Sequence, residues 1–237
     1  MSEEYLSHNE KHWQQGCEAE NVESHVFRPY GVILRDELGL TGRDGEKVLD
    51  FGCGEGTNSY FFKQKGFNVF GVDISKPDLS RCMQKMPDIK NQFIECNRKP
   101  SINDMFFDGD FDLVIAIHSM YYYTNEDLEI RLNSLYNMMK PGGIIYVTMI
   151  GTQSEQFSYA DDENDGLYRV SLPHMGRDRV KESYSPHYKN FTSNMDELID
   201  KFSMFDPLHI GHFEERYSQT GATKVSHVFH YTFIGQK

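Results

Sequence analysis

The segment VLDFGCGEG at positions 48–56 combines glycines and acidic residues in a spacing that suits a ligand-binding site. A short apolar run leads directly into Gly52, Gly54 and Gly56, and a segment of helical character follows at once. Glycines at such a turn let the backbone bend sharply and let a ligand lie against main-chain atoms, where a Cβ would collide. The spacing therefore predicts a loop that binds a small ligand along its backbone.

Acidic residues around this loop narrow the kind of ligand. Asp73 ends the next apolar run, 21 residues after Gly52, where a carboxylate can accept hydrogen bonds from both hydroxyls of a ribose. The glycines follow GxGxG, whereas dinucleotide sites use GxGxxG. Asp50 and Glu55 would repel a pyrophosphate but suit a cofactor that carries a sulfonium and an ammonium group. The pattern disfavours an NAD-dependent oxidoreductase.

These residues need a framework that brings the ends of neighbouring strands together. Strand-like runs are expected at 47–51, 67–72, 91–96, 111–117 and 144–149, with helices at 57–65, 79–85 and 126–139. Their alternation predicts a parallel sheet with right-handed crossovers. A helix at 194–202 and two strands follow, and the last strand alternates apolar and polar residues as an antiparallel strand does. We expect an α/β fold with a doubly wound, mostly parallel seven-stranded sheet, an antiparallel last strand and helices on both faces.

The chain reads as a single domain over 1–237 with four parts. These are an N-terminal helical lid (1–45), a cofactor-binding core (46–150), a substrate-cap insert (151–190) and a C-terminal helix with strands (191–237). The lid includes a helix expected at 27–38. The insert breaks the alternation and is expected to be a long loop, of a length that is usually either functional or disordered.

With these motifs the sequence resembles the class I, Rossmann-like S-adenosylmethionine-dependent methyltransferases over about 48–149. LDFGCGEG matches the glycine motif, GVDIS the acidic second-strand motif, and LNSLYNMMKPGGIIYVTM the helix, turn and fifth strand. The resemblance implies S-adenosylmethionine as cofactor, with Asp73 on the ribose, Ile74 on the adenine, and Asn97 where the family often has an aspartate that binds the adenine amino group. The cofactor-binding residues that it implies are Asp50, Gly52, Cys53, Gly54, Asp73, Ile74, Asn97 and His118.

The segment after the fourth strand suggests the type of chemistry. His118 is a candidate catalytic base for a hydroxyl or ammonium nucleophile, and the alternative is that it only positions the cofactor or caps the loop. Of the tyrosines at 121–123, Tyr122 is a candidate substrate contact, although each could simply pack the loop. The family's Asn/Asp-Pro-Pro-Tyr motif and the carboxylate ligands of catechol-type enzymes are missing here. We therefore expect a small-molecule enzyme without a metal.

Further substrate contacts are expected from the lid and the insert. Trp13 could cover the site, or belong to a mobile terminus. Arg169 and Arg177, in a group of seven basic residues of the insert that also includes Lys189, could attract an anionic substrate, or could neutralise DDEND at 161–165. Four histidines of the last strands could bind a metal, but are expected instead to occupy solvent-facing strand positions: His209, His212, His227 and His230.

Composition limits the partners and the function. With 36 acidic and 24 basic residues the net charge is −12, which argues against nucleic acid as a partner. The four cysteines are scattered, and no signal peptide or membrane span is apparent, so the expected location is the cytoplasm. The expected function is O-methylation of a small molecule. The acceptor would be a metabolite, a sugar or a nucleotide-linked intermediate, and it could be anionic. Protein or RNA methylation and a non-catalytic cofactor-binding role stay open, as do the acceptor's identity and the oligomeric state.

Overall fold

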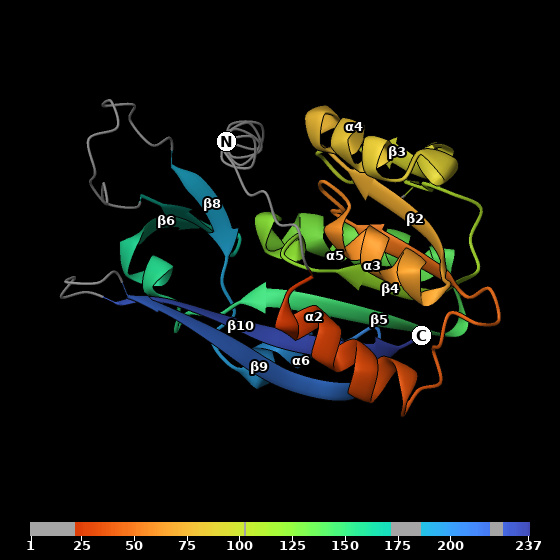
Figure 1. Cartoon of the computed structure of the whole chain (residues 1–237). Helices are drawn as coiled ribbons and strands as arrows, with labels where there is room; N and C mark the ends of the chain where they lie inside the picture. Colours follow the sequence, from red (N-terminus) through yellow and green to blue (C-terminus); the bar gives the residue numbers. More distant parts are fainter. Residues whose placement is uncertain (1–21, 102, 172–185, 219–224) are drawn as a thin grey trace.

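A seven-stranded sheet forms the centre of the computed structural model, which describes residues 22–101, 103–171, 186–218 and 225–237 (Figure 1). The strand order is β3-β2-β1-β4-β5-β10-β9. The strands are β1 (Lys47–Phe51), β2 (Asn68–Asp73), β3 (Phe93–Glu95), β4 (Phe111–Ala116), β5 (Met139–Ile150), β9 (Asp206–Ser218) and β10 (Val225–Gln236). β1 to β5 pair in parallel, and β10 is antiparallel to both β5 and β9. The predicted sheet is confirmed, and its order reverses between β1 and β4, the position where such sheets bind ligands.

Helices cover both faces of this sheet, as predicted. They are α2 (Ser24–Pro29) with the π-helical η1 (Tyr30–Arg35), α3 (Thr57–Lys65), α4 (Lys76–Lys85), α5 (Asn125–Met138) and α6 (Met195–Lys201). The hydroxyl of Ser75 caps α4 by accepting from the backbone N–H of Asp78, and Thr124 caps α5 in the same way. α2, η1, α3 and α4 bury residues in one apolar cluster, while α5 and α6 bury residues in a second.

The central strands supply both clusters by alternation. Val48 of β1 packs in the first cluster and Leu49 in the second, and Leu113 and Val114 of β4 divide in the same way. Neighbouring side chains of a strand point to opposite faces, so a continuous apolar run is needed where both faces are covered. The core therefore lies on both sides of the sheet and leaves the strand ends free to carry the site.

The insert differs from the predicted long loop. It begins with a 3-10 turn, η4 (Glu155–Tyr159), and then forms a three-stranded antiparallel sheet. Its strands are β6 (Ala160–Asn164), β7 (Leu167–Val170) and β8 (His187–Asn190). Asp165 and Gly166 both have positive φ in the turn between β6 and β7, and Asp-Gly is a typical hairpin turn. The small sheet lies beyond the arrowhead of β5, at the carboxyl edge of the main sheet (Figure 1).

The lid region is described from residue 22 onward. Its predicted helix appears as α2 and η1, which pack on the sheet through Val26, Tyr30 and Leu34. Trp13 and Arg177 lie outside the described residues. No described helix is long and apolar enough to cross a membrane.

Candidate functional site

A cavity of about 540 Å³ lies at the carboxyl ends of the central strands. Its volume is in the range of small-molecule sites. One side is formed by the loop after β1 and the end of β2, and the other by the loop after β4, by α2 and by the strands β8 and β10. The site is thus built where the strand order reverses, and segments far apart in the sequence complete it.

The glycine loop has the geometry that its sequence predicts. Gly52, Gly54 and Gly56 have φ values of 78°, 50° and 79°, a region that favours glycine. A Cβ on Gly52 would lie 2.5 Å from Cβ of Ser119, and one on Gly56 would lie 2.5 Å from Sγ of Cys82. A Cβ on Gly54 would meet no heavy atom within 4 Å among the described residues. Gly54 therefore leaves space in the cavity, whereas its two neighbours allow close packing.

Asp73 connects the glycine loop to the end of β2. Its Oδ2 accepts from the backbone N–H of Gly54 at 2.7 Å, and its Oδ1 accepts from the N–H of Ser75 at 2.8 Å. The carboxyl is on the cavity wall beside Ile74 and Asp78, and burial raises its pKa. Sequence analysis did not single out Asp78, which lies in the first turn of α4.

Three residues of the predicted cofactor set do not line the cavity. Asp50 and Cys53 are buried beneath the loop. Asp50 Oδ2 accepts from the hydroxyl of Ser59 at 2.6 Å, while Oδ1 has no partner among the described residues, and burial raises the pKa of Asp50 to about 7. Asn97 is exposed, and its neighbours Cys96 and Arg98 line the cavity instead.

His118 and the tyrosines after it form the opposite wall. His118 has a φ of 58°, a sparsely populated conformation for a residue with a side chain, and its N–H donates to Thr148 Oγ1 at 2.8 Å. Its Nε2 lies 3.0 Å from Nε2 of His25, and burial lowers the pKa of His118 to about 3. Tyr121, Tyr122 and Tyr123 are all buried and all line the cavity.

His230 corrects the expectation that the late histidines face solvent. It is 3% exposed, lines the cavity, and its ring centroid lies 4.5 Å from that of His118. His209 pairs with Glu37, and His227 pairs with Glu214, away from the cavity. His227 and His230 lie an odd number of positions apart in β10, so their side chains point to opposite faces of the strand, but only the packing of β10 near His118 shows which face is buried.

Of the basic residues in the insert, Lys189 reaches the cavity. It is 5% exposed, and its Nζ donates to Gln156 Oε1 at 2.7 Å and lies 5.2 Å from the ring centroid of Tyr121. Burial lowers the pKa of Lys189 to about 7. Arg169 forms ion pairs with Asp161 and Asp162 at the surface and is not on the cavity wall.

Known proteins with similar sequences are described as methyltransferases. Residues 48–143 match the family model described as a methyltransferase domain. The chain is 30% identical over 169 residues to the cypemycin N-terminal methyltransferase of a Streptomyces species, which covers 70% of this chain and 65% of the relative. Residues 48–143 therefore belong to the methyltransferase-domain family.

Two further comparisons show what this chain is similar to. It is 28% identical over 145 residues to a ubiquinone biosynthesis O-methyltransferase of Pseudomonas aeruginosa, covering 60% of each chain. A solved S-adenosylmethionine-dependent methyltransferase from Methanosarcina mazei has the same fold, with a TM-score of 0.65, 16% identity, and coverage of 92% of this chain and 98% of that chain. The chain spans less than two thirds of the length of the two curated relatives named here.

The cavity fits S-adenosylmethionine, the cofactor of the methyltransferases that this chain resembles. Gly54 provides open space along the backbone, and the unpaired buried Oδ1 of Asp50 lies below the same loop. Glu55 and Asp78 add carboxylates to the wall, although Glu55 also pairs with Arg81 at 2.6 Å. A sulfonium cation is favoured by such surroundings.

Proposed function

We propose that this chain transfers the methyl group of S-adenosylmethionine to an oxygen atom of a small molecule. The observation that carries this proposal is that one cavity includes both the glycine loop with Asp73 and the wall with His118 and Lys189. S-adenosylmethionine supplies an activated methyl group on its sulfonium. The protein then has to align sulfur, methyl and acceptor and to exclude water, which together account for much of the rate of such reactions.

On the cofactor side, we assign Asp73 to the ribose hydroxyls and Ile74 to the adenine face. Gly52 and Gly54 would lie against the methionine part, with the carboxyl of Asp50 buried beneath them. Asp73 already accepts two backbone N–H groups, which fix its orientation before the ribose arrives. Because they are absent from the cavity wall, Cys53 and Asn97 would act through the backbone or through their neighbours.

Gly54→Val is expected to weaken binding of S-adenosylmethionine by about tenfold or more, because a branched side chain would occupy the open space beside the backbone. The control is Gly45→Val, which has a similar φ of 74° and also meets no described atom, but is exposed and far from the cavity. Calorimetric titration measures both variants. Equal weakening in the two variants would attribute the loss to backbone strain and would contradict the assignment of this loop.

S-adenosylmethionine is also expected to bind more tightly as the pH rises from about 6 to 8. The pKa of Asp50 is about 7 in the free protein, so the carboxyl is partly protonated at neutral pH. A cationic cofactor favours the carboxylate, and binding therefore releases a proton. Calorimetry in two buffers with different ionisation enthalpies measures that release. Asp50→Asn should reduce both the release and the pH dependence, and an unchanged release would place the proton elsewhere.

On the acceptor side, Lys189 is better suited than His118 to receive a proton. A base works best when its pKa is close to the working pH, and the pKa is about 7 for Lys189 but about 3 for His118. Lys189 in its charged form could instead hold an anionic oxygen. The aromatic wall of Phe51, Tyr121 and Tyr122 favours an acceptor with a planar body. His118 would contact the acceptor without acting as the base.

The relatives are named for more than one kind of acceptor, since one is an O-methyltransferase and another an N-terminal methyltransferase. A lysine with a pKa near 7 suits a hydroxyl, which must lose its proton on methylation. The net charge of −12 disfavours RNA. Methylation of a protein, or cofactor binding without turnover, are the alternatives that the experiment below distinguishes.

The test is release of S-adenosylhomocysteine with panels of phenols, hydroxy acids, amines, peptides and RNA, followed by mass spectrometry of the product. We expect turnover with a hydroxylated small molecule and a product methylated on oxygen. Turnover only with amines, peptides or RNA would contradict the proposal. Tight cofactor binding without turnover on any panel would favour the non-catalytic alternative.

A further inference from the structure

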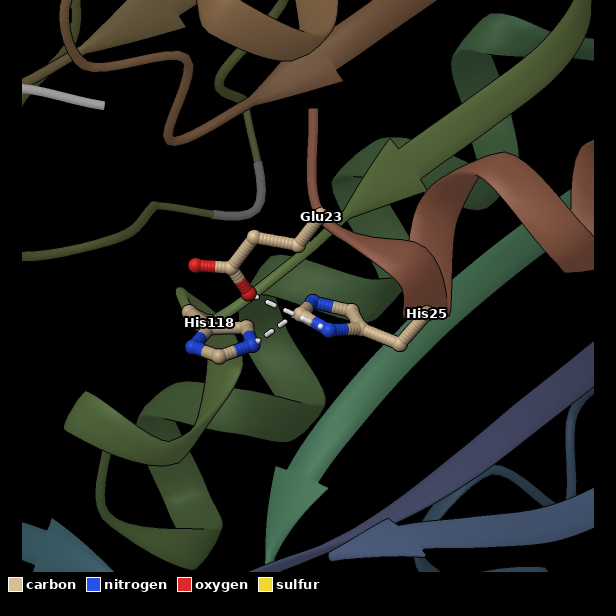
Figure 2. Close-up of side chains that lie close together, drawn as sticks. All are labelled: Glu23, His25 and His118. Carbon is tan, nitrogen blue, oxygen red and sulfur yellow. Dashed lines mark hydrogen bonds and ion pairs between the residues drawn. The ribbon is translucent and has the colours of Figure 1, made fainter. Parts of the chain in front are cut away.

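Glu23, His25 and His118 form a cluster of possible metal ligands in the cavity wall. Glu23 directly precedes α2, His25 lies in its first turn, and His118 follows β4 (Figure 2). One potential ligand atom from each lies within 4.8 Å of the other two. Figure 2 shows the Glu23 carboxylate and the His118 ring pointing toward the His25 ring from different elements.

Hydrogen bonds within the protein do not fully account for this cluster. His25 Nε2 and His118 Nε2 face each other at 3.0 Å, so one of them must give up its proton for the pair to bond. His25 Nδ1 lies 3.1 Å from Glu23 Oε2 but makes no aligned hydrogen bond with any described residue, so no hydrogen bond fixes the Glu23 carboxylate at this nitrogen. His25 is 6% exposed, and buried polar atoms without partners are rare in folded proteins.

We propose that Glu23, His25 and His118 bind one divalent transition-metal ion. Two imidazole nitrogens and a carboxylate oxygen are a ligand set used for Zn²⁺ and Fe²⁺. Two nitrogens bound at about 2.1 Å lie about 3.0 Å apart on an octahedral ion and about 3.4 Å apart on a tetrahedral one. The Nε2–Nε2 separation of 3.0 Å is thus closer to the octahedral geometry. An ion would thus replace the contact between the two rings, with the Glu23 side chain adjusting at the cavity surface, where it is half exposed.

The surroundings are consistent with a bound cation. Glu215 of β9 lines the same cavity and adds a second carboxylate near Glu23 and His25. The His25 ring stacks on Phe213 at a centroid distance of 4.0 Å and an interplanar angle of 3°, which holds its orientation. The unusual backbone of His118, with φ at 58°, likewise holds its ring toward His25.

The three ligands would leave coordination positions open toward the cavity. Where the proposed function holds, an acceptor oxygen could occupy one of them, and coordination lowers the pKa of a hydroxyl. This role rests on the proposed O-methylation, whereas metal binding itself does not. No metal was expected from the sequence, because the carboxylates that catechol-type enzymes place near the fourth strand are missing. The cluster proposed here takes two of its three ligands from the N-terminal segment instead.

The experiment is titration of chelator-treated protein with Co²⁺, followed by absorption spectroscopy and calorimetry, and repeated with Zn²⁺. We expect one ion per chain, with Co²⁺ absorption in the visible region that Zn²⁺ abolishes. His25→Ala, His118→Ala and Glu23→Gln should each weaken binding by about tenfold or more. The matched control is His227→Ala, because His227 also pairs with a glutamate at 2.8 Å but outside the cavity.

Glu23→Gln keeps the proposal testable if a histidine variant fails to fold, because Glu23 is a half-exposed residue outside the core. Absence of saturable binding, or equal binding by the three variants and the wild type, would overturn the metal site. Binding of S-adenosylmethionine is measured on the same samples. Cofactor binding without metal binding would overturn only the metal site, whereas metal binding without cofactor binding would overturn only the proposed function.

Discussion

Asp73→Ala is expected to weaken binding of S-adenosylmethionine by roughly 10- to 100-fold, which corresponds to about 1.5–3 kcal/mol for hydrogen bonds to a charged group. The variant removes the acceptor for the ribose hydroxyls. It also removes the acceptor for the N–H groups of Gly54 and Ser75. Calorimetry measures the affinity, and thermal unfolding measures the stability that is lost with those two bonds.

Asp73→Asn is the matched variant, because its amide oxygen can still accept one backbone N–H. We expect it to recover part of the stability but little of the cofactor affinity, since the amide group offers one acceptor in place of two. If Asp73→Ala lowered the melting temperature and left the affinity unchanged, Asp73 would be a structural residue of the loop and not a cofactor ligand.

Lys189→Met is expected to abolish most of the methyl transfer and at the same time to stabilise the fold near pH 6. Loss of a proton acceptor in the site should lower kcat by about 100-fold or more, while cofactor affinity changes little because Lys189 is on the acceptor side of the cavity. Burial of the charge is unfavourable, so its removal should raise the free energy of unfolding, by about 1–3 kcal/mol once the lost bond to Gln156 is considered.

The pH dependence of this effect follows from the direction of the pKa change. Burial lowers the pKa of Lys189 from 10.5 to about 7, so between these values the unfolded chain binds more protons than the folded chain. Wild-type stability should therefore rise with pH across this window. The advantage of Lys189→Met should be largest below pH 7 and shrink towards pH 10. Urea unfolding at pH 6, 7.5 and 9 measures it.

Lys201→Met is the control for burial of a lysine. Lys201 is mostly buried, with 11% of its side chain exposed, but its Nζ donates to Asn190, Phe191 and Thr192 and pairs with Glu197. Because its charge is well satisfied, we expect that variant to lose stability and to leave acceptor binding unchanged. A loss of stability in Lys189→Met, with normal turnover, would contradict a functional role for Lys189.

Local patterns in the sequence were sufficient to predict the glycine loop and the end of β2, which form one wall of the cavity. Apolar runs and helical segments follow one another in order along the chain, and the glycine loop and Asp73 end two adjacent strands. The positions of Gly52, Gly54, Asp73 and Ile74 could therefore be predicted, because adjacent parallel strands bring their carboxyl ends to one edge. The alternation of β1 and β4 between two apolar clusters follows from the same local pattern.

The acceptor half depends on contacts that no local pattern encodes. Lys189, His230 and His25 come from β8, β10 and α2, and only the packing of these elements around the end of β4 brings them to His118. In sequence Lys189 is one of seven basic residues of the insert, and burial alone separates it from Arg169, which pairs with Asp161 at the surface. Burial is decided by tertiary packing, and it is burial that lowers the pKa of Lys189 and His118. Local sequence patterns thus predict the sheet and the glycine loop. Only the packing of distant segments shows which titratable groups share the cavity.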